Sequence, residues 1–277
     1  MFTTTEELNI TLSREELEFL LYLLKSGPIL GFDPDPLERY SKEQTALTFA
    51  QAERSLRARG LADLDENGNV VVREAILLMA GTCAFPEFLL AAHSFPSTGE
   101  PKRIFWNGRA GVIVAHERPE APLHHLSFLK DRDNLLKEII DFCKIEFPNK
   151  ASFGEFQITN SDLKTVREQI KNSPKKAVKL LEKAGSSPDA AQEVCSILSG
   201  KYIVIAFHSL VAQAEIEAIQ ESASLLVGRT STWLLQNVNP ETVIVKPIGE
   251  TELIDLFLKW TSPAENWISI PGLSQDN

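Results

Sequence analysis

The sequence predicts an α+β protein of two quasi-symmetric halves, each containing helices, a four-stranded antiparallel sheet and a closing helix. Capped helical segments stand before and after groups of short strand-like runs, the order typical of helices packed on an antiparallel sheet. The same order of elements then occurs a second time within the 277 residues. We therefore expect a first half over residues 1–145, a second half over 146–261 and a polar tail over 262–277.

The first half begins with helices and continues into strands. Ser13 and Glu16 match a capping box, and the leucines that follow recur at helical spacing. Asn67-Gly68 and Asn107-Gly108 are dipeptides that favour tight hairpin turns. The expected elements are a helix from Ser13 to Leu24, a helix over 46–59, a hairpin over 61–72, a helix over 74–81, strands over 88–94, 103–106, 110–117 and 123–128, and a helix over 131–144.

The second half repeats this order. Pro174 and Pro188 each stand where a helix begins, a position that tolerates proline because its missing N–H is not needed there. The sequences AAHSF at 91–95 and AFHSL at 206–210 occupy matching places, which favours an internal duplication. The expected elements are helices over 160–170, 175–184 and 188–198, strands over 201–208, 222–228, 232–237 and 242–246, and a helix over 250–260.

Charge and cysteine content indicate the kind of partner and compartment. The formal net charge of −10 disfavours nucleic acid as a partner, because an acidic surface repels phosphates. The 3 cysteines are far apart and form no CxxC pair, which suits a reducing cytosol. The N-terminus lacks the features of a signal peptide, and the apolar runs are too short to span a bilayer. We expect a cytoplasmic protein that does not bind a membrane.

One acidic segment resembles a calcium loop. Asp63, Asp65, Asn67 and Glu74 have the spacing of oxygen ligands in an EF-hand. Gly60, however, interrupts the incoming helix, and the chain offers no second loop to pair with the first. Because hairpin turns favour Asp, Asn and Gly, an acidic turn explains the same residues. We therefore expect no calcium and no other metal at this position.

The histidines give weaker signals. His93 and His208 hold matching positions in the two halves, so they either bind a ligand near a pseudo-twofold axis or serve as structural residues, and the structural role is favoured. His124 and His125 are adjacent in a strand, so their side chains point to opposite faces and cannot chelate one metal together.

No motif predicts catalysis. The sequence has no GxSxG, HExxH, GxGxxG or Walker pattern, so we expect no catalytic residue and no cofactor. Phe105 and Trp106 precede the predicted Asn107-Gly108 turn, and Trp233 stands in the corresponding strand of the second half. Aromatic residues at such places serve either as core or as exposed anchors for a protein partner. The sequence favours the anchor hypothesis for Phe105, Trp106 and Trp233.

Six segments carry a resemblance to a known family: 56–61 before the acidic hairpin, 103–117, 181–185, 189–191, 231–234 and 243–258. They resemble the EspG-like chaperones of type VII (ESX) secretion systems, and the resemblance covers about residues 12–261. It implies two quasi-symmetric halves around a central sheet, a cytosolic location, and binding to the tip of a secreted helical PE–PPE pair, which the chaperone keeps soluble. This chain is richer in Lys, Phe and Ile than that family, which leaves the identity of its client open.

The leading hypothesis is a non-enzymatic cytosolic module that binds another protein, such as a secreted helical client, and holds its exposed apolar segment. One alternative is a winged-helix transcriptional regulator, because residues 13–72 are expected to form two helices and a hairpin, and the second helix carries Arg54, Arg57 and Arg59. The other alternative is an enzyme whose site has no recognisable motif.

Overall fold

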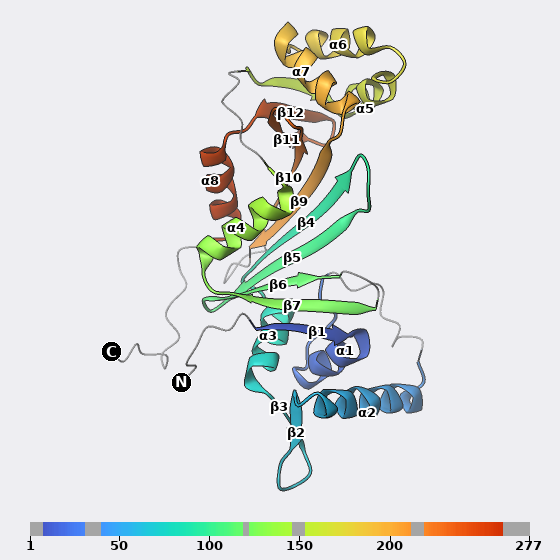
Figure 1. Cartoon of the computed structure of the whole chain (residues 1–277), viewed down its shortest axis with the longest axis vertical. Coiled ribbons are helices and arrows are strands. Elements are labelled where there is room, and N and C mark those ends of the chain that lie inside the picture. The colour runs from blue at the N-terminus through green and yellow to red at the C-terminus, as the bar shows by residue number, and fades with distance from the viewer. Residues whose placement is uncertain (1–7, 31–39, 119–121, 146–152, 212–218, 263–277) are drawn as a thin grey trace, which may run out of the picture.

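The structure is a computed structural model that describes residues 8–30, 40–118, 122–145, 153–211 and 219–262 (Figure 1). Ten strands within these residues form one antiparallel sheet in the order β1-β7-β6-β5-β4-β9-β10-β11-β12-β8. The α+β class is confirmed. The predicted tail lies outside the described residues, except for Ser262. The strands of this sheet are β1 Asn9–Ser13, β4 Phe88–Pro96, β5 Lys102–Arg109, β6 Val112–Glu117, β7 Leu123–Leu129, β8 Phe156–Thr159, β9 Ile203–Val211, β10 Ile219–Val227, β11 Thr232–Asn239 and β12 Thr242–Pro247.

Five strands of this sheet come from residues 8–145 and five from residues 153–262, one more in each range than predicted. The missed strands, β1 and β8, are the two edges; they have only 5 and 4 residues and run directly into helices. The helices are α1 Arg14–Leu23, α2 Lys42–Ala58, α3 Glu74–Ala84, α4 Arg132–Cys143, α5 Asn160–Gln169, α6 Pro174–Lys183, α7 Pro188–Ser199 and α8 Glu250–Trp260. The predicted acidic hairpin is confirmed as β2 Ala62–Leu64 paired with β3 Val70–Val72.

The strand order is the same on both sides of the β4–β9 pair. From the centre outwards it runs β4, β5, β6, β7, β1 on one side and β9, β10, β11, β12, β8 on the other. Ala92 lies opposite Phe207 at the middle of the β4–β9 register. An internal duplication predicts this order, and the common origin of the two halves stays a prediction.

Local sequence explains where the helices begin. Ser13 accepts a hydrogen bond from the Glu16 backbone N–H, and the Glu16 carboxylate accepts one from the Ser13 N–H, so the predicted capping box of α1 is confirmed. A second capping box, Ser41 with Gln44, starts α2 at Lys42. The sequence placed that start four residues too late because only the apolar periodicity was used. The cap of α5 is Thr159, whose side-chain oxygen accepts a hydrogen bond from the Asp162 N–H.

Helices cover the two sides of the sheet differently. Helices α4 and α8 lie side by side on one side and enclose a core with Leu90, Trp106 and Phe207. On the other side, α1, α2 and α3 pack over one end of the sheet, and α5, α6 and α7 pack over the other end (Figure 1). The strands β4 and β9 lie between these two helical layers.

The Asn107-Gly108 turn prediction was wrong. Both residues lie inside β5, and the hairpin turns at Ala110 and Gly111, which have φ of 49° and 79°. Two successive residues with positive φ produce the twist of a hairpin turn. The glycine at position 108 has another cause: a Cβ there would lie 1.9 Å from the Phe88 ring, so only glycine allows this close packing.

Candidate functional site

The middle of the sheet, on the side away from α4 and α8, lies between the two helical layers and combines buried and accessible side chains. Successive side chains of a strand point to opposite sides. Because Ala92 and Phe207 point into the core beneath α4 and α8, the residues next to them in sequence point to the other side. We call this part of the surface the central face and define it by Leu89, Ala91, His93, Phe105, His208 and Leu210.

A row of rings crosses the central face and continues under the first helical layer. It joins five strands, from β9 through β4, β5 and β6 to β7. Neighbouring ring centroids are 6.4, 6.2, 5.7 and 5.1 Å apart. These distances lie in the range of favourable aromatic contacts. The rings in order are His208, His93, Phe105, His116 and His124.

The buried end of this row is a histidine pair. His116 and His124 are 0% and 2% exposed, and Nε2 of His116 lies 2.8 Å from Nδ1 of His124. Burial, followed by the charges of His124 and Arg118, lowers the pKa of His116 to about 3. A neutral imidazole at neutral pH fits a structural role. The prediction that His124 and His125 diverge is confirmed, because His125 bonds Thr11 Oγ1 at 2.7 Å.

The accessible end of the row lies next to an arginine. His93 is half-buried, His208 is exposed, and Arg103 lies directly opposite His93 across β4 and β5. Burial lowers the pKa of His93, and the charges of Arg103 and His208 lower it further. The sequence identified the two histidines as a pair. It did not identify Arg103, because the register between β4 and β5 was not predicted.

A cavity of about 260 Å³ opens beside His208, under α5 and α7. Its wall is mainly aliphatic and includes Leu163, Leu198 and Leu235, whereas polar groups such as Asn160 and Ser222 are also present. The volume is slightly below the 300–1,000 Å³ of a typical small-molecule site. It suits one or two apolar side chains of a partner better than a cofactor.

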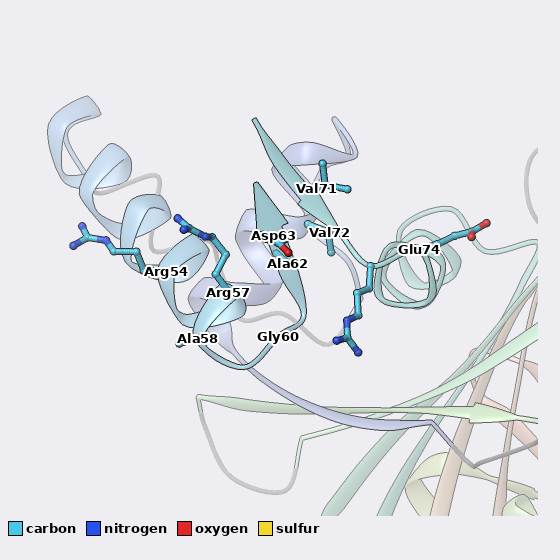
Figure 2. Close-up of a pocket in the computed structure, with 10 residues that line it drawn as sticks. Arg54, Arg57, Ala58, Gly60, Ala62, Asp63, Val71, Val72 and Glu74 are labelled. Carbon is cyan, nitrogen blue, oxygen red and sulfur yellow. The ribbon is translucent and has the colours of Figure 1, made fainter. Parts of the chain in front are cut away.

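A larger hollow of about 930 Å³ lies between α2, the β2–β3 hairpin and the start of α3 (Figure 2). In Figure 2, Arg54 and Arg57 extend from α2 in different directions, and Asp63 lies on the hairpin. The Arg57 guanidinium pairs with Glu53 of its own helix at 3.2 Å. The side chains therefore form no converging cluster around one ligand.

The calcium-loop residues lie around this hairpin. Asp65 accepts hydrogen bonds from the backbone N–H groups of Asn67 and Asn69, both at 2.8 Å, and from the Asn69 side chain. These bonds lower the pKa of Asp65 and build a compact turn. Glu74 instead begins α3 and is exposed. The described residues contain no group of three or more His, Cys, Asp or Glu side chains placed to hold a metal.

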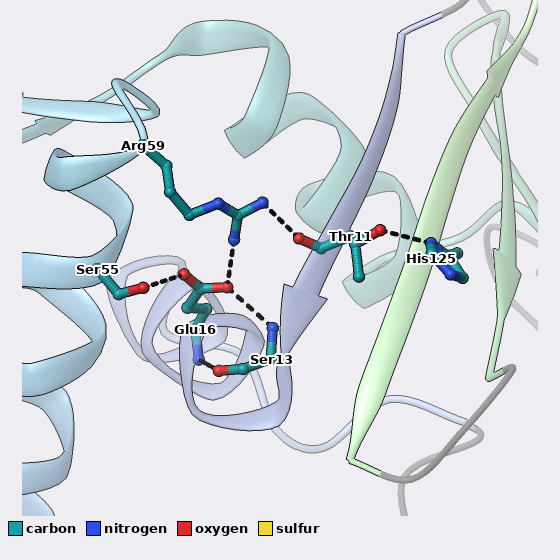
Figure 3. A network of polar contacts seen from close by, with 6 residues as sticks. All are labelled: Thr11, Ser13, Glu16, Ser55, Arg59 and His125. Atoms are coloured by element: carbon teal, nitrogen blue, oxygen red, sulfur yellow. Dashed lines mark hydrogen bonds and ion pairs between the residues drawn. The ribbon is translucent and has the colours of Figure 1, made fainter.

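Polar contacts hold α2 firmly against the sheet (Figure 3). The Glu16 carboxylate is almost completely buried and accepts hydrogen bonds from Ser55 Oγ and from the Arg59 guanidinium, both at 2.7 Å. Arg59 also donates to the Thr11 carbonyl at 2.6 Å. The Glu16 carboxylate thus connects α1, α2 and β1. These contacts give the Glu16 cluster a role in stabilising the fold.

The three aromatic residues proposed as exposed anchors are buried. Trp106 and Trp233 are 0% exposed and Phe105 is 5% exposed. Trp106 packs edge-on against Phe142 of α4, and Trp233 stacks on Phe153. The expectation of exposure was wrong because the turn lies beyond Trp106 rather than next to it. Contact of these residues with a partner stays a prediction.

Comparison with known proteins gives a result at the level of the fold. No protein-family model matches this sequence, and no curated protein matches it. Among solved structures, the chain is similar to the Mycobacterium tuberculosis type VII secretion system chaperone EspG5, solved in complex with the PE25-PPE41 dimer. The TM-score is 0.60 at 14% identity, over 91% of this chain and 95% of EspG5. The two chains share a fold.

None of the described helices is both long and apolar enough to cross a membrane.

Proposed function

We propose that this protein is a non-enzymatic, chaperone-like module that holds an apolar segment of another protein on the central face. The observation that carries the proposal is the aliphatic cavity that opens there beside His208. An apolar wall with a few polar groups provides burial for a partner side chain and fixes its orientation. The shared fold with EspG5, whose solved complex contains a protein dimer, supports a protein as the occupant. A secreted helical client and a cytoplasmic location remain part of this proposal.

The test is a substitution in the cavity wall. Leu235 lines the cavity and is only partly buried, so Leu235→Gln adds a polar group where the partner would dock. Removing a hot-spot contact at the centre of an interface costs about 2 kcal/mol or more, which corresponds to roughly thirtyfold weaker binding. Tagged wild type and variant would be compared in affinity capture from the native host, followed by measurement of the affinity for the captured protein.

Ile244→Gln is the matched control. Ile244 is also a partly buried aliphatic residue, but it is one residue removed from Val243 and Val245, so it points to the opposite side of the sheet. We expect Ile244→Gln to retain binding. Equal loss in both variants, or copurification of a metabolite in place of a protein, contradicts the proposal.

A further inference from the structure

We propose that His93, Arg103 and His208 form a carboxylate-binding site on the central face, which recognises an acidic side chain next to the apolar segment of the partner. The identity of the occupant rests on the proposed function. The anion site itself rests on the geometry and charges described below.

The three side chains come from three neighbouring strands. Arg103 is the direct register partner of His93 across β4 and β5. His208 is one diagonal step from His93 across β4 and β9, and the two rings are 6.4 Å apart at an angle of 77°. Because backbone hydrogen bonds fix the spacing of these strands, the three groups are held near one another before any ligand arrives.

The charge around this cluster is unusual for so acidic a chain. The net charge is −10, yet the residues that line the adjoining cavity include Arg167 and His208 and no carboxylate. The groups whose charges act on His93 are Arg103 and His208, both cationic when protonated. Glu221 is the acidic residue of the adjacent part of β10. It is one residue from Ser222 of the cavity wall and points to the other side, where Trp260 Nε1 and Lys259 Nζ bind it at 2.8 and 2.7 Å.

An anion fits these observations better than a metal ion does. Arg103 repels a cation bound between the two imidazoles, whereas it attracts a carboxylate and can bind it with two parallel hydrogen bonds. His93 and His208 can each add a ring N–H donor. An anion also relieves the mutual repulsion of the three groups, which no described carboxylate does.

The anion site is tested without any partner, with sulfate as the probe. Sulfate keeps its charge across neutral pH, so a change in affinity with pH reports on the protein. The histidine ring signals would be followed by nuclear magnetic resonance at pH 6.5, with sodium chloride at equal ionic strength as the reference. We expect saturable shifts of His93 and His208, no shift of His125, and tighter binding at pH 6 than at pH 8.

Arg103→Gln should weaken sulfate binding at least about tenfold, because a charge-assisted hydrogen bond contributes about 1.5 to 3 kcal/mol. Arg229→Gln, at an exposed arginine beyond β10, is the control and should leave the affinity unchanged. Equal affinity of wild type and Arg103→Gln overturns the proposal, as do shifts of all histidines together or an affinity that does not change with pH.

The source of the carboxylate is tested with the captured partner. Replacing acidic residues of the partner's docking segment by amides should weaken its binding and remove its pH dependence. If sulfate binds but these amide variants bind normally, the recognition of a partner side chain is wrong. If Leu235→Gln has no effect on capture, the proposed function is wrong. The anion site is then still decided by the sulfate measurements alone.

Discussion

The two helical layers on the same side of the sheet differ in what holds them in place. The layer of α1, α2 and α3 is tied to β1 by the buried Glu16 carboxylate, and it encloses the His116–His124 pair. The layer of α5, α6 and α7 packs through aliphatic side chains and leaves a cavity next to the central face. The hollow of the first layer lies at the β2–β3 hairpin, whereas the cavity of the second layer adjoins the central face, so only the second can accept a partner there. Binding is therefore expected at the C-terminal end of the central face.

The largest expected effect concerns the core on the opposite side of the sheet, beneath α4 and α8. Trp106→Ala removes a completely buried indole and should lower the free energy of unfolding by about 3 to 5 kcal/mol. Urea unfolding measures this loss. The control is Phe95→Ala, at a 47% exposed ring in β4, which should change stability by about 0.5 kcal/mol or less. Weaker partner binding with an unchanged unfolding midpoint would instead support the anchor role predicted from the sequence.

Removing one polar side chain from each layer tests whether the α1–α3 layer and the α5–α7 layer are held in place differently. Arg59→Ala leaves the buried Glu16 carboxylate without its cation and should cost about 3 kcal/mol. Glu193→Ala, in α7, removes two hydrogen bonds from Thr230 and Ser231 at the partly exposed rim and should cost about 1 kcal/mol. Equal losses in urea unfolding would show that the two layers are held alike.

Local signals in the sequence were sufficient for most helices and strands. The Ser13 capping box, the prolines at 174 and 188, and the acidic hairpin each depend on a few neighbouring residues, and each appears where expected. The edge strands β1 and β8 were missed because each is short and continues directly into a helix whose cap is a stronger signal. Their assignment depends on pairing with β7 and β12, which lie far away in the sequence.

The candidate site was predicted only in part. Equivalent positions in the two halves pointed to His93 and His208, and the β4–β9 register brings them together. Arg103 and the cavity under α5 and α7 required the tertiary structure, because cavities form between elements distant in sequence. Aromatic residues before an apparent turn pointed to exposed anchors, but Gly108 lies in the strand to make room for Phe88. An Asn-Gly dipeptide can therefore lie inside a strand where a neighbouring ring packs closely, as well as in a turn.

The histidine pair beneath α1, α2 and α3 should also make the protein sensitive to acid. His116 has a folded-state pKa of about 3, against about 6.5 in the unfolded chain. Below pH 6.5 the unfolded state takes up a proton that the folded state does not, so stability falls as the pH drops from 6.5 toward 3. The loss should approach about 1.4 kcal/mol per pH unit. Urea unfolding at several pH values measures it.

His116→Phe should make the free energy of unfolding depend less on pH between 6.5 and 3. A phenyl ring keeps the contact with Phe105 and cannot take up a proton. His125→Gln, at a histidine bonded to Thr11 on the other side of β7, should keep the pH dependence. A slope that is unchanged in His116→Phe would assign the acid sensitivity to other groups.

The smallest expected effect has the opposite sign and comes from the side of the sheet covered by α4. Burial, with the charges of Glu117 and Asp141, raises the pKa of Glu138 to about 7, while the nearby indole N–H of Trp106 opposes the rise. The folded state takes up this proton below pH 7 and the unfolded state only near 4.5. The stabilisation of the fold by protonated Glu138 is therefore present at low pH and is lost as the pH rises through 7.

Glu138→Gln should therefore raise the free energy of unfolding at pH 8, by about 1 kcal/mol once solvent screening of this partly exposed group is considered. At pH 4 the variant and the wild type should be almost equally stable, because Glu138 is then neutral in the folded state and mostly neutral in the unfolded state. Urea unfolding at the two pH values decides the matter, and a variant less stable than the wild type at pH 8 would mean that the Glu138 carboxylate has a favourable partner in the folded chain.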